Sequence, residues 1–185
     1  VSLKVFLKKF KKYFFRVNKP KIFIHWLKTS YKYIKFFKGN KFHQKKLVGI
    51  NLPPDYISLD SIINNLKSEY FSHIYLKIDI EGWEYRLLQD LILHSEVIEG
   101  LAIEFHDVDL HIDKIEKFIK KFPLTLVHTH CNNYSPLNDN NMPLAIECTF
   151  SCETVSKQLV TNLPNVLDMP NNPQIEDYKL AFFNE

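Results

Sequence analysis

Glycine is scarce in this sequence of 185 residues, because only four occur and no two of them form a Gly-x-Gly pair. The four are Gly39, Gly49, Gly82 and Gly100. Many α/β proteins bind a nucleotide-type cofactor with a glycine-rich loop that follows a strand and opens a helix. The sequence contains no recognisable loop of this kind.

Cysteines and long apolar runs are also scarce. Cys131, Cys148 and Cys152 are an odd number of cysteines, without the spacing of a disulfide framework or a Cys-x-x-Cys metal pair. We interpret them as structural thiols in a reducing compartment, and we expect a cytoplasmic protein. No uninterrupted apolar run approaches the length of a transmembrane helix or of the hydrophobic part of a signal peptide.

Acidic residues are absent from the first quarter of the chain. Residues 1–46 contain 15 of the 24 lysines and arginines, and the first acid is Asp55. The other 9 basic residues stand against all 21 acids, so residues 47–185 carry a formal charge of −12. This split indicates a basic segment joined to an acidic domain.

The basic segment is predicted to form two amphipathic helices, at residues 1–17 and 21–38, separated at Pro20. Each has an apolar, aromatic stripe beside a lysine stripe. Three interpretations stay open. The helices cover the domain, or residues 1–38 lie on an anionic membrane surface, or they bind nucleic acid. No recognised motif accompanies the charge, so no specific nucleic-acid partner is expected.

Residues 73–84, HIYLKIDIEGWE, organise the rest of the chain. Ile74, Leu76 and Ile78 alternate with polar residues, which indicates a buried strand, and apolar residues then recur at helical spacing after Gly82. We predict a helix at residues 83–94. The acidic turn between them lies where open α/β sheets bind their ligands, beyond the carboxyl end of a parallel strand.

Further strands and helices alternate on either side of this stretch. We predict strands at residues 47–52, 101–106, 124–130 and 143–152, and helices at 61–66 (capped by Ser58 or Asp60) and 107–121. The order predicts an α/β fold with a partial Rossmann-like sheet, in which an antiparallel hairpin closes a set of parallel strands. The predicted domain is residues 47–155, and the proline-containing tail, 156–185, is expected to be largely irregular.

The segment LKIDIEGWE, residues 76–84, resembles the central motif of the FkbM family of S-adenosylmethionine-dependent methyltransferases, roughly K-[IV]-D-[IV]-E-G-x-E. Further segments resemble neighbouring parts of the family pattern: ISLD at 57–60, LAIEFH at 101–106, HTHCNNY at 128–134 and AIECTF at 145–150. The match covers about residues 47–150. The resemblance implies a class I methyltransferase sheet and methylation of a hydroxyl, such as a sugar hydroxyl in a glycan.

The sequence departs from the family at its first strand and glycine-containing cofactor loop, which it lacks. The resemblance therefore implies only the C-terminal half of the domain, with the cofactor half either absent or supplied by another chain. The simplest interpretation is a truncated methyltransferase, either a fragment or a decayed copy, that is inactive alone. We expect weak or undetectable binding of S-adenosylmethionine, and the sequence identifies no cofactor-binding residues. A sheet edge left open by missing strands would favour association with another chain, so an oligomer is also expected.

Polar residues gather at the predicted ends of three strands. They are Asp79 and Glu81 after the first strand, Glu104, His106 and Asp107 at the second, and His128, His130, Asn132 and Asn133 at the third. If these strands are neighbours, the polar groups converge on one crevice. Residues 128 and 130 are two apart, so both side chains point to the same face of an extended strand.

O-methyl transfer requires a group that takes the proton of the acceptor hydroxyl. His106 and His130 are the candidate bases, because histidine titrates near neutral pH; Asp79 is predicted to contact the substrate or a cation, and Glu81 to orient it. The predicted substrate-binding residues are Glu104, Asp107, His128, Asn132 and Asn133. A divalent cation held by carboxylates and an amide is an alternative way to acidify the hydroxyl, although the sequence defines no metal-ligand set.

Purely structural interpretations of these residues stay open too. Asp79 and Glu81 could cap the helix that follows, and Glu84 is expected to face solvent. Two other functions also remain: a non-catalytic binding or membrane-associated domain on the same fold, and a metal-dependent hydrolase built on the histidines at 106, 128 and 130 with the nearby acids.

Overall fold

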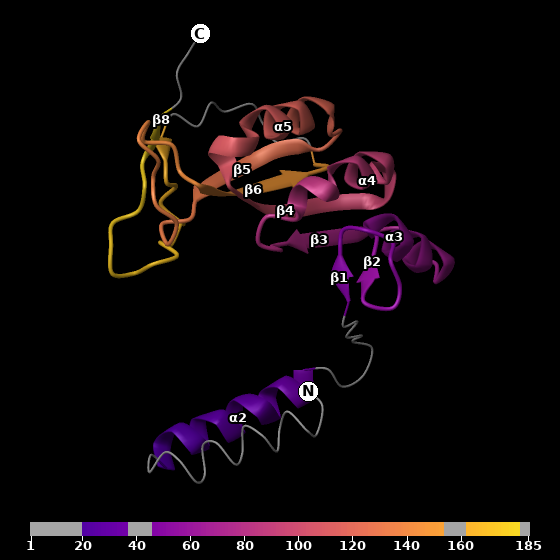
Figure 1. The fold of residues 1–185 in the computed structure, drawn as a ribbon, viewed down its shortest axis with the longest axis horizontal. Coiled ribbons are helices and arrows are strands. Elements are labelled where there is room, and N and C mark those ends of the chain that lie inside the picture. Colours follow the sequence, from indigo (N-terminus) through magenta and orange to yellow (C-terminus); the bar gives the residue numbers. More distant parts are fainter. Residues whose placement is uncertain (1–19, 37–45, 154–161, 182–185) are drawn as a thin grey trace. The chain divides into compact units, whose positions relative to one another are not determined.

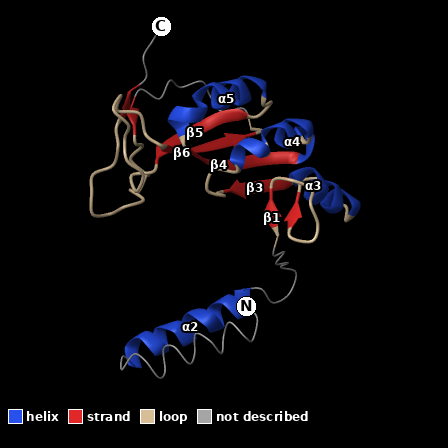
Figure 2. Cartoon of the chain, viewed as in Figure 1, coloured by secondary structure: helices blue, strands red, loops and turns tan. Residues whose placement is uncertain are grey.

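The structure is a computed structural model that describes residues 20–36, 46–153 and 162–181 (Figure 1). The chain divides into two compact units, Val1–Lys45 and Lys46–Glu185. Figure 2 shows that the described part of the first unit is helical, whereas the second unit combines helices with strands.

The first unit contains helix α2, Pro20–Phe36. Proline is favoured at the first position of a helix because its missing N–H would have no partner there. The helix predicted at 21–38 is therefore found, and the one predicted at 1–17 lies outside the described residues. Four exposed apolar residues recur three or four apart along α2: Ile24, Leu27, Tyr31 and Ile34. None of the described helices is long and apolar enough to cross a bilayer, and the contact of residues 1–38 with a membrane surface stays a prediction.

The second unit opens with two short parallel strands, β1 at Leu47–Val48 and β2 at Tyr56–Ile57. The strand predicted at 47–52 is shorter than expected, and β2 was not predicted. The chain turns back on itself between them, and the backbone N–H of Tyr56 donates to the carbonyl of Leu52. The two strands then pair with each other and not with the larger sheet.

Helix α3, Leu59–Ser68, follows directly; it is longer than the helix predicted at 61–66, and of its two predicted caps Ser58 is the one observed. The Ser58 hydroxyl accepts a hydrogen bond from the backbone N–H of Ser61 at 3.1 Å, which satisfies one of the free donors of the first turn. Ile63 lies on the buried face of this helix and has no exposed surface.

A four-stranded mixed sheet forms the centre of the unit. Its strands are β3 at Ile74–Ile78, β4 at Ile98–His106, β5 at Thr125–Cys131 and β6 at Ala145–Ser151. The spatial order is β3-β4-β6-β5, with β3 and β4 parallel and β6 antiparallel to both of its neighbours. The predicted parallel pair and antiparallel hairpin are confirmed, and the hairpin's last strand lies inside the sheet.

The prediction of one continuous helix at 83–94 is wrong, because three short elements cover this segment. A 3₁₀ turn, η1, covers Glu84–Arg86, helix α4 covers Leu88–Leu93, and a second 3₁₀ turn, η2, covers Ser95–Val97. The backbone N–H groups of Arg86 and Leu87 donate to the carbonyls three residues earlier, at Trp83 and Glu84. This bonding pattern is that of a 3₁₀ turn, so the chain leaves the acidic turn in a tighter coil than an α-helix.

The core lies between the sheet and the helices α4 and α5, the latter at Val108–Lys121 (Figure 1). Alternate residues of β4 point into it, and the ring of Phe105 contacts that of Phe118 on α5 in an edge-on arrangement. Phe118 also packs on Phe122 and Phe150. The other alternate residues of β4, which include Glu104 and His106, point to the opposite face of the sheet.

The tail after β6 is largely irregular in the described residues, as predicted. Its only regular structure there is a pair of two-residue antiparallel strands, β7 at Asn162–Leu163 and β8 at Leu180–Ala181. Both belong to the same compact unit as the sheet.

The aromatic core gives a direct test of this fold. Replacing Phe118 with Ala is expected to lower the free energy of unfolding by about 3–5 kcal/mol, because it leaves a cavity among three aromatic rings. Leu110, on the same helix but 74% exposed, provides the control, and L110A is expected to change stability by less than about 0.5 kcal/mol. Urea denaturation measures both. Equal effects of the two substitutions would contradict the packing of α5 on the sheet.

Candidate functional site

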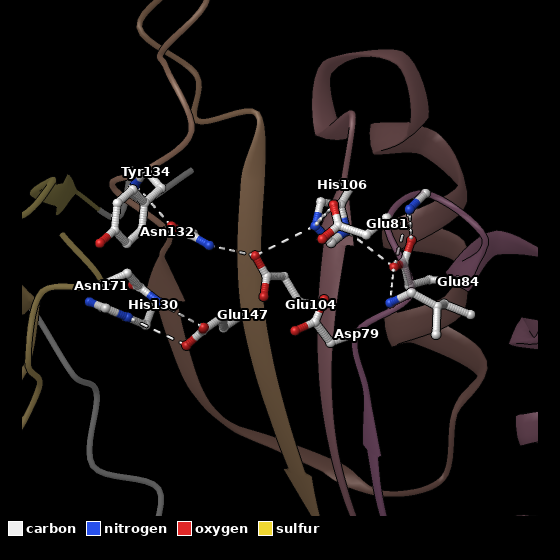
Figure 3. A network of polar contacts seen from close by, with 12 residues as sticks. Asp79, Glu81, Glu84, Glu104, His106, His130, Asn132, Tyr134, Glu147 and Asn171 are labelled. Carbon is white, nitrogen blue, oxygen red and sulfur yellow. Dashed lines mark hydrogen bonds and ion pairs between the residues drawn. The ribbon is translucent and has the colours of Figure 1, made fainter. Parts of the chain in front are cut away.

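Polar side chains form a row across one face of the sheet (Figure 3). Strand register places Glu104 of β4 opposite Glu147 of β6, and Glu147 opposite His130 of β5. Asp79 directly follows the end of β3 and extends the row on its other side. The row therefore crosses all four strands, and it runs past the carboxyl ends of the two parallel ones.

A second, shorter row lies two residues further along the same face. His106 is the last residue of β4 and pairs with Ala145. On the other side of Ala145, the backbone N–H of Asn132 donates to its carbonyl. Because alternate residues of a strand share a face, the side chain of His106 lies beside that of Glu104. Asn132, the residue that follows β5, also reaches Glu104. The Asn132 side-chain amide donates to Glu104 Oε1 at 2.6 Å.

His106 is oriented by a buried carboxylate. Its Nδ1 lies 3.1 Å from Glu84 Oε1. An ionised carboxylate only accepts hydrogen bonds, so this contact places the ring proton on Nδ1 and leaves the lone pair of the neutral ring on Nε2. Nε2 faces two further carboxylates, Glu81 Oε2 at 3.5 Å and Glu104 Oε1 at 3.7 Å.

Glu84 is buried, contrary to the prediction. It was expected to face solvent, but it has no exposed surface. Its carboxylate accepts hydrogen bonds from the backbone N–H groups of Ile80 and Gly82, each at 3.0 Å. It therefore closes the turn itself, and neither Asp79 nor Glu81 is seen to cap η1. No signal in the sequence pointed to this role, because the φ of +95° at Gly82 and the N–H groups that Glu84 accepts are features of the folded turn.

Three of the predicted site residues come together closely. Asp79, Glu104 and His106 each offer a ligand atom, and these atoms lie within 4.8 Å of one another. The Glu104 side chain is 6% exposed, whereas that of Asp79 is 43% exposed and lies 3.9 Å from the ammonium of Lys77. The group thus combines a fixed, buried carboxylate with a more accessible one.

His128 and His130 do not join this group, contrary to the prediction of one crevice. His130 Nε2 lies 2.7 Å from Asp177 Oδ2, and His128 Nε2 lies 3.0 Å from Asp168 Oδ1. Both acids come from the tail, which therefore covers this end of β5. His130 is consequently an ion-pair partner and not a free base.

The substrate-binding role predicted for Asn133 also needs correction. Asn133 is 1% exposed, and its side chain exchanges hydrogen bonds with the backbone of Asn172, donating to its carbonyl and accepting from its N–H. It anchors the tail and cannot reach an acceptor. Asp107 occupies the N-cap position of α5 with a φ of +49°, and its side chain is exposed and makes no capping hydrogen bond there, so its role in substrate binding stays a prediction.

Two more residues of the site were missed. Glu147 continues the polar row and accepts a hydrogen bond from the side chain of Asn171 at 3.0 Å. The hydroxyl of Tyr85 donates to the backbone carbonyl of His106 and so holds the end of β4. The alternation of residues 145–150 is a signal that could have identified Glu147, whereas nothing in the local pattern points to Tyr85.

The cysteines stand apart from this site. Cys131 and Cys148 are buried free thiols, and Cys152 is exposed. Burial raises the pKa of each buried thiol to about 12. Both therefore stay protonated at neutral pH, which suits the predicted structural role.

Comparisons with protein-family models, curated proteins and solved structures find no match for this chain.

The pairing of His130 with Asp177 predicts a pH-dependent stability. Burial opposes protonation of His130, but the hydrogen bond to Asp177 and the charges of Asp177, Asp168 and Glu147 outweigh it, so the pKa of His130 is raised above 6.5. A raised pKa means that the stabilisation is fully present below pH 6.5 and is lost as the pH rises through the folded-state value.

We therefore expect His130→Gln to lower the free energy of unfolding by about 1.5–3 kcal/mol at pH 6, and by less at pH 9. Urea denaturation at both pH values measures the difference. The control is His73→Gln, since the His73 side chain is 72% exposed. An equal loss at pH 6 and pH 9 would show that the ion pair does not stabilise the fold.

Proposed function

We propose that this chain carries the acceptor side of an FkbM-like, S-adenosylmethionine-dependent O-methyltransferase. In this proposal the side chains around His106 bind a hydroxyl of a sugar in a glycan and take up its proton. The observation that carries the proposal is the position of His106, whose Nδ1 is bound to buried Glu84 while Nε2 faces the accessible carboxylate of Glu81.

The fold supports this proposal at a coarse level. A mixed α/β sheet with a parallel pair and an antiparallel hairpin is the arrangement that the resemblance implies. The three acids of the DIEGWE motif are Asp79, Glu81 and Glu84, and all follow the carboxyl end of β3, where α/β sheets bind ligands. The assignment of this sheet to a Rossmann-like methyltransferase fold is itself part of the proposal.

The chemistry of the group suits a hydroxyl-rich acceptor. Asp79 and Glu81 are exposed enough to accept hydrogen bonds from sugar hydroxyls, with side chains 43% and 86% exposed. When one acceptor O–H bond breaks, its electron pair stays on the oxygen, and the proton passes to the neutral ring of His106 at Nε2. Glu84 then stabilises the charged ring through Nδ1.

S-adenosylmethionine, which would supply the methyl group, does not fit the described residues. A cofactor cradle needs glycines whose missing side chains leave open space. A Cβ atom at Gly49 would instead lie 2.8 Å from the Trp83 ring, and one at Gly100 would overlap the ring of Tyr75. Of the three described glycines only Gly82 has open space, with Asp107 Oδ2 at 3.7 Å as its nearest neighbour, and a single glycine does not make a cradle. The proposal therefore assigns the cofactor to residues outside the described ones or to another chain.

This assignment predicts the outcome of a cofactor titration. Isothermal calorimetry of the purified chain with S-adenosylmethionine is expected to show no saturable heat at concentrations up to about 1 mM, a free energy of binding weaker than about 4 kcal/mol. Micromolar affinity would show that the chain has a cofactor site of its own.

Acceptor binding is tested separately, by NMR of the histidine rings. We expect methyl glycosides of hexoses and 6-deoxyhexoses to shift the ring signals of His106, because its Nε2 faces the accessible side of the group. The signals of exposed His73 serve as the internal control and are expected to stay unchanged. If no glycoside shifts His106 more than His73, the proposed acceptor site is wrong.

A further inference from the structure

Glu104 is a buried carboxylate whose nearest basic group in the described part of the chain is the imidazole of His106, which carries a positive charge only when protonated. Its side chain is 6% exposed, and its hydrogen bond from Asn132 comes from a neutral amide. Glu147 stands directly opposite on β6 and adds a second carboxylate, whose nearest basic group is His130 Nδ1 at 3.6 Å. Like charges directly opposite each other destabilise a sheet unless something offsets them. Among the described residues, no lysine or arginine forms an ion pair with Glu104.

The hydrogen bond of Glu104 falls on a single oxygen. In Figure 3 the dashed lines to Glu104 meet at Oε1, and in the described part of the chain no hydrogen bond reaches Oε2. A buried ionised carboxylate is stable only when it is paired, hydrogen-bonded or bound to a metal. Oε2 is not one of the polar atoms that are both buried and without a partner, so it has access to solvent and capacity for a further positive partner.

His106 has the orientation of a metal ligand. Metal-binding histidines usually donate their other ring N–H to a carboxylate, which fixes the tautomer and makes the ligating nitrogen more basic. Glu84 occupies this outer position at Nδ1, and two backbone N–H groups hold it in place. Nε2 lies 3.5 Å and 3.7 Å from the nearest carboxylate oxygens, which is too far for hydrogen bonds.

These separations are close to those across a bound ion. Two ligand atoms that each lie about 2.1 Å from a metal are about 3.0–3.4 Å apart at tetrahedral or octahedral angles. The contact of His106 Nε2 with Glu104 is only a few tenths of an ångström wider. Asp79, the third member, is on the accessible side and can close the remaining gap by rotating its side chain.

We propose that Asp79, Glu104 and His106 Nε2 bind one divalent transition-metal ion on the open face of the sheet. The imidazole ligand favours Mn²⁺ or Zn²⁺ over Ca²⁺, which takes oxygen ligands. Three protein ligands leave coordination positions for water or for a substrate oxygen, as in catalytic metal sites.

The metal would also change how the acceptor hydroxyl is activated, a role that rests on the function proposed above. A metal-bound hydroxyl has a lowered pKa. Its O–H bond breaks, the electron pair stays on the oxygen bound to the metal, and the proton passes to the carboxylate of Glu81, which is exposed and exchanges with water. With the ion bound, His106 Nε2 is a ligand and Glu81 takes the proton, whereas in the metal-free site His106 takes it.

Mn²⁺ binding to the full chain tests the inference by electron paramagnetic resonance and calorimetry. We expect one saturable site per chain, with the affinity reduced at least about tenfold by Asp79→Asn and by Glu104→Gln. Asp79 is partly exposed, so D79N keeps the test valid even if E104Q fails to fold. Glu99→Gln removes a carboxylate from the same strand β4, where the side chain is 55% exposed, and is expected to bind Mn²⁺ like the unaltered chain.

Equal affinity in D79N and E99Q, or no saturable binding, would overturn the inference. Substoichiometric Mn²⁺ is further expected to broaden the ring signals of His106 before those of His73, and broadening of both together would also count against it. Failure of the glycoside titration would leave these results unaffected, because metal binding needs no acceptor. Success of that titration without a metal would retain the acceptor site and remove only the ion.

Discussion

The carboxylate of Glu84 joins the two segments from which the site is built. It has no exposed surface and accepts hydrogen bonds from the backbone of the turn after β3 while it contacts the ring of His106 at the end of β4. A buried donor left without its partner costs about 1–3 kcal/mol, and here several donors share one acceptor group. The position of Asp79 and Glu81 and the tautomer of His106 both follow from this residue.

Side chains alternate between the two faces of the sheet along each strand, and this alternation places the rest of the site on one face and the core on the other. In β4, Leu101, Ile103 and Phe105 are buried against the helices, so Glu104 and His106 necessarily point to the opposite face. Register with β6 and β5 then extends the polar face from β4 to Glu147 and His130. The same two-residue period therefore generates an apolar face that stabilises the sheet and a polar face that can bind ligands.

The tail divides this polar face into two parts. Asp168 and Asp177 pair with His128 and His130, and the backbone around Asn172 holds Asn133, so the β5 end is occupied by the chain's own groups. The β3–β4 end has no such cover among the described residues, and the exposed side chain of Glu81 marks its open side. The proposed chemistry accordingly belongs to the β3–β4 end.

Local patterns in the sequence determined much of this protein. The cap at Ser58, the strands β3 and β4, the helix α5, the antiparallel hairpin and the convergence of Asp79, Glu104 and His106 were predictable, because periodicity and strand ends specify them within a short stretch. The resemblance to FkbM methyltransferases rests on the same short motif and stays a proposal. Only the tertiary structure decided that Glu84 is buried, that β6 lies between β4 and β5, and that His130 binds an acid 47 residues further along the chain. Each of these depends on contacts between segments that are far apart in the sequence, and a local pattern carries no information about which segments meet.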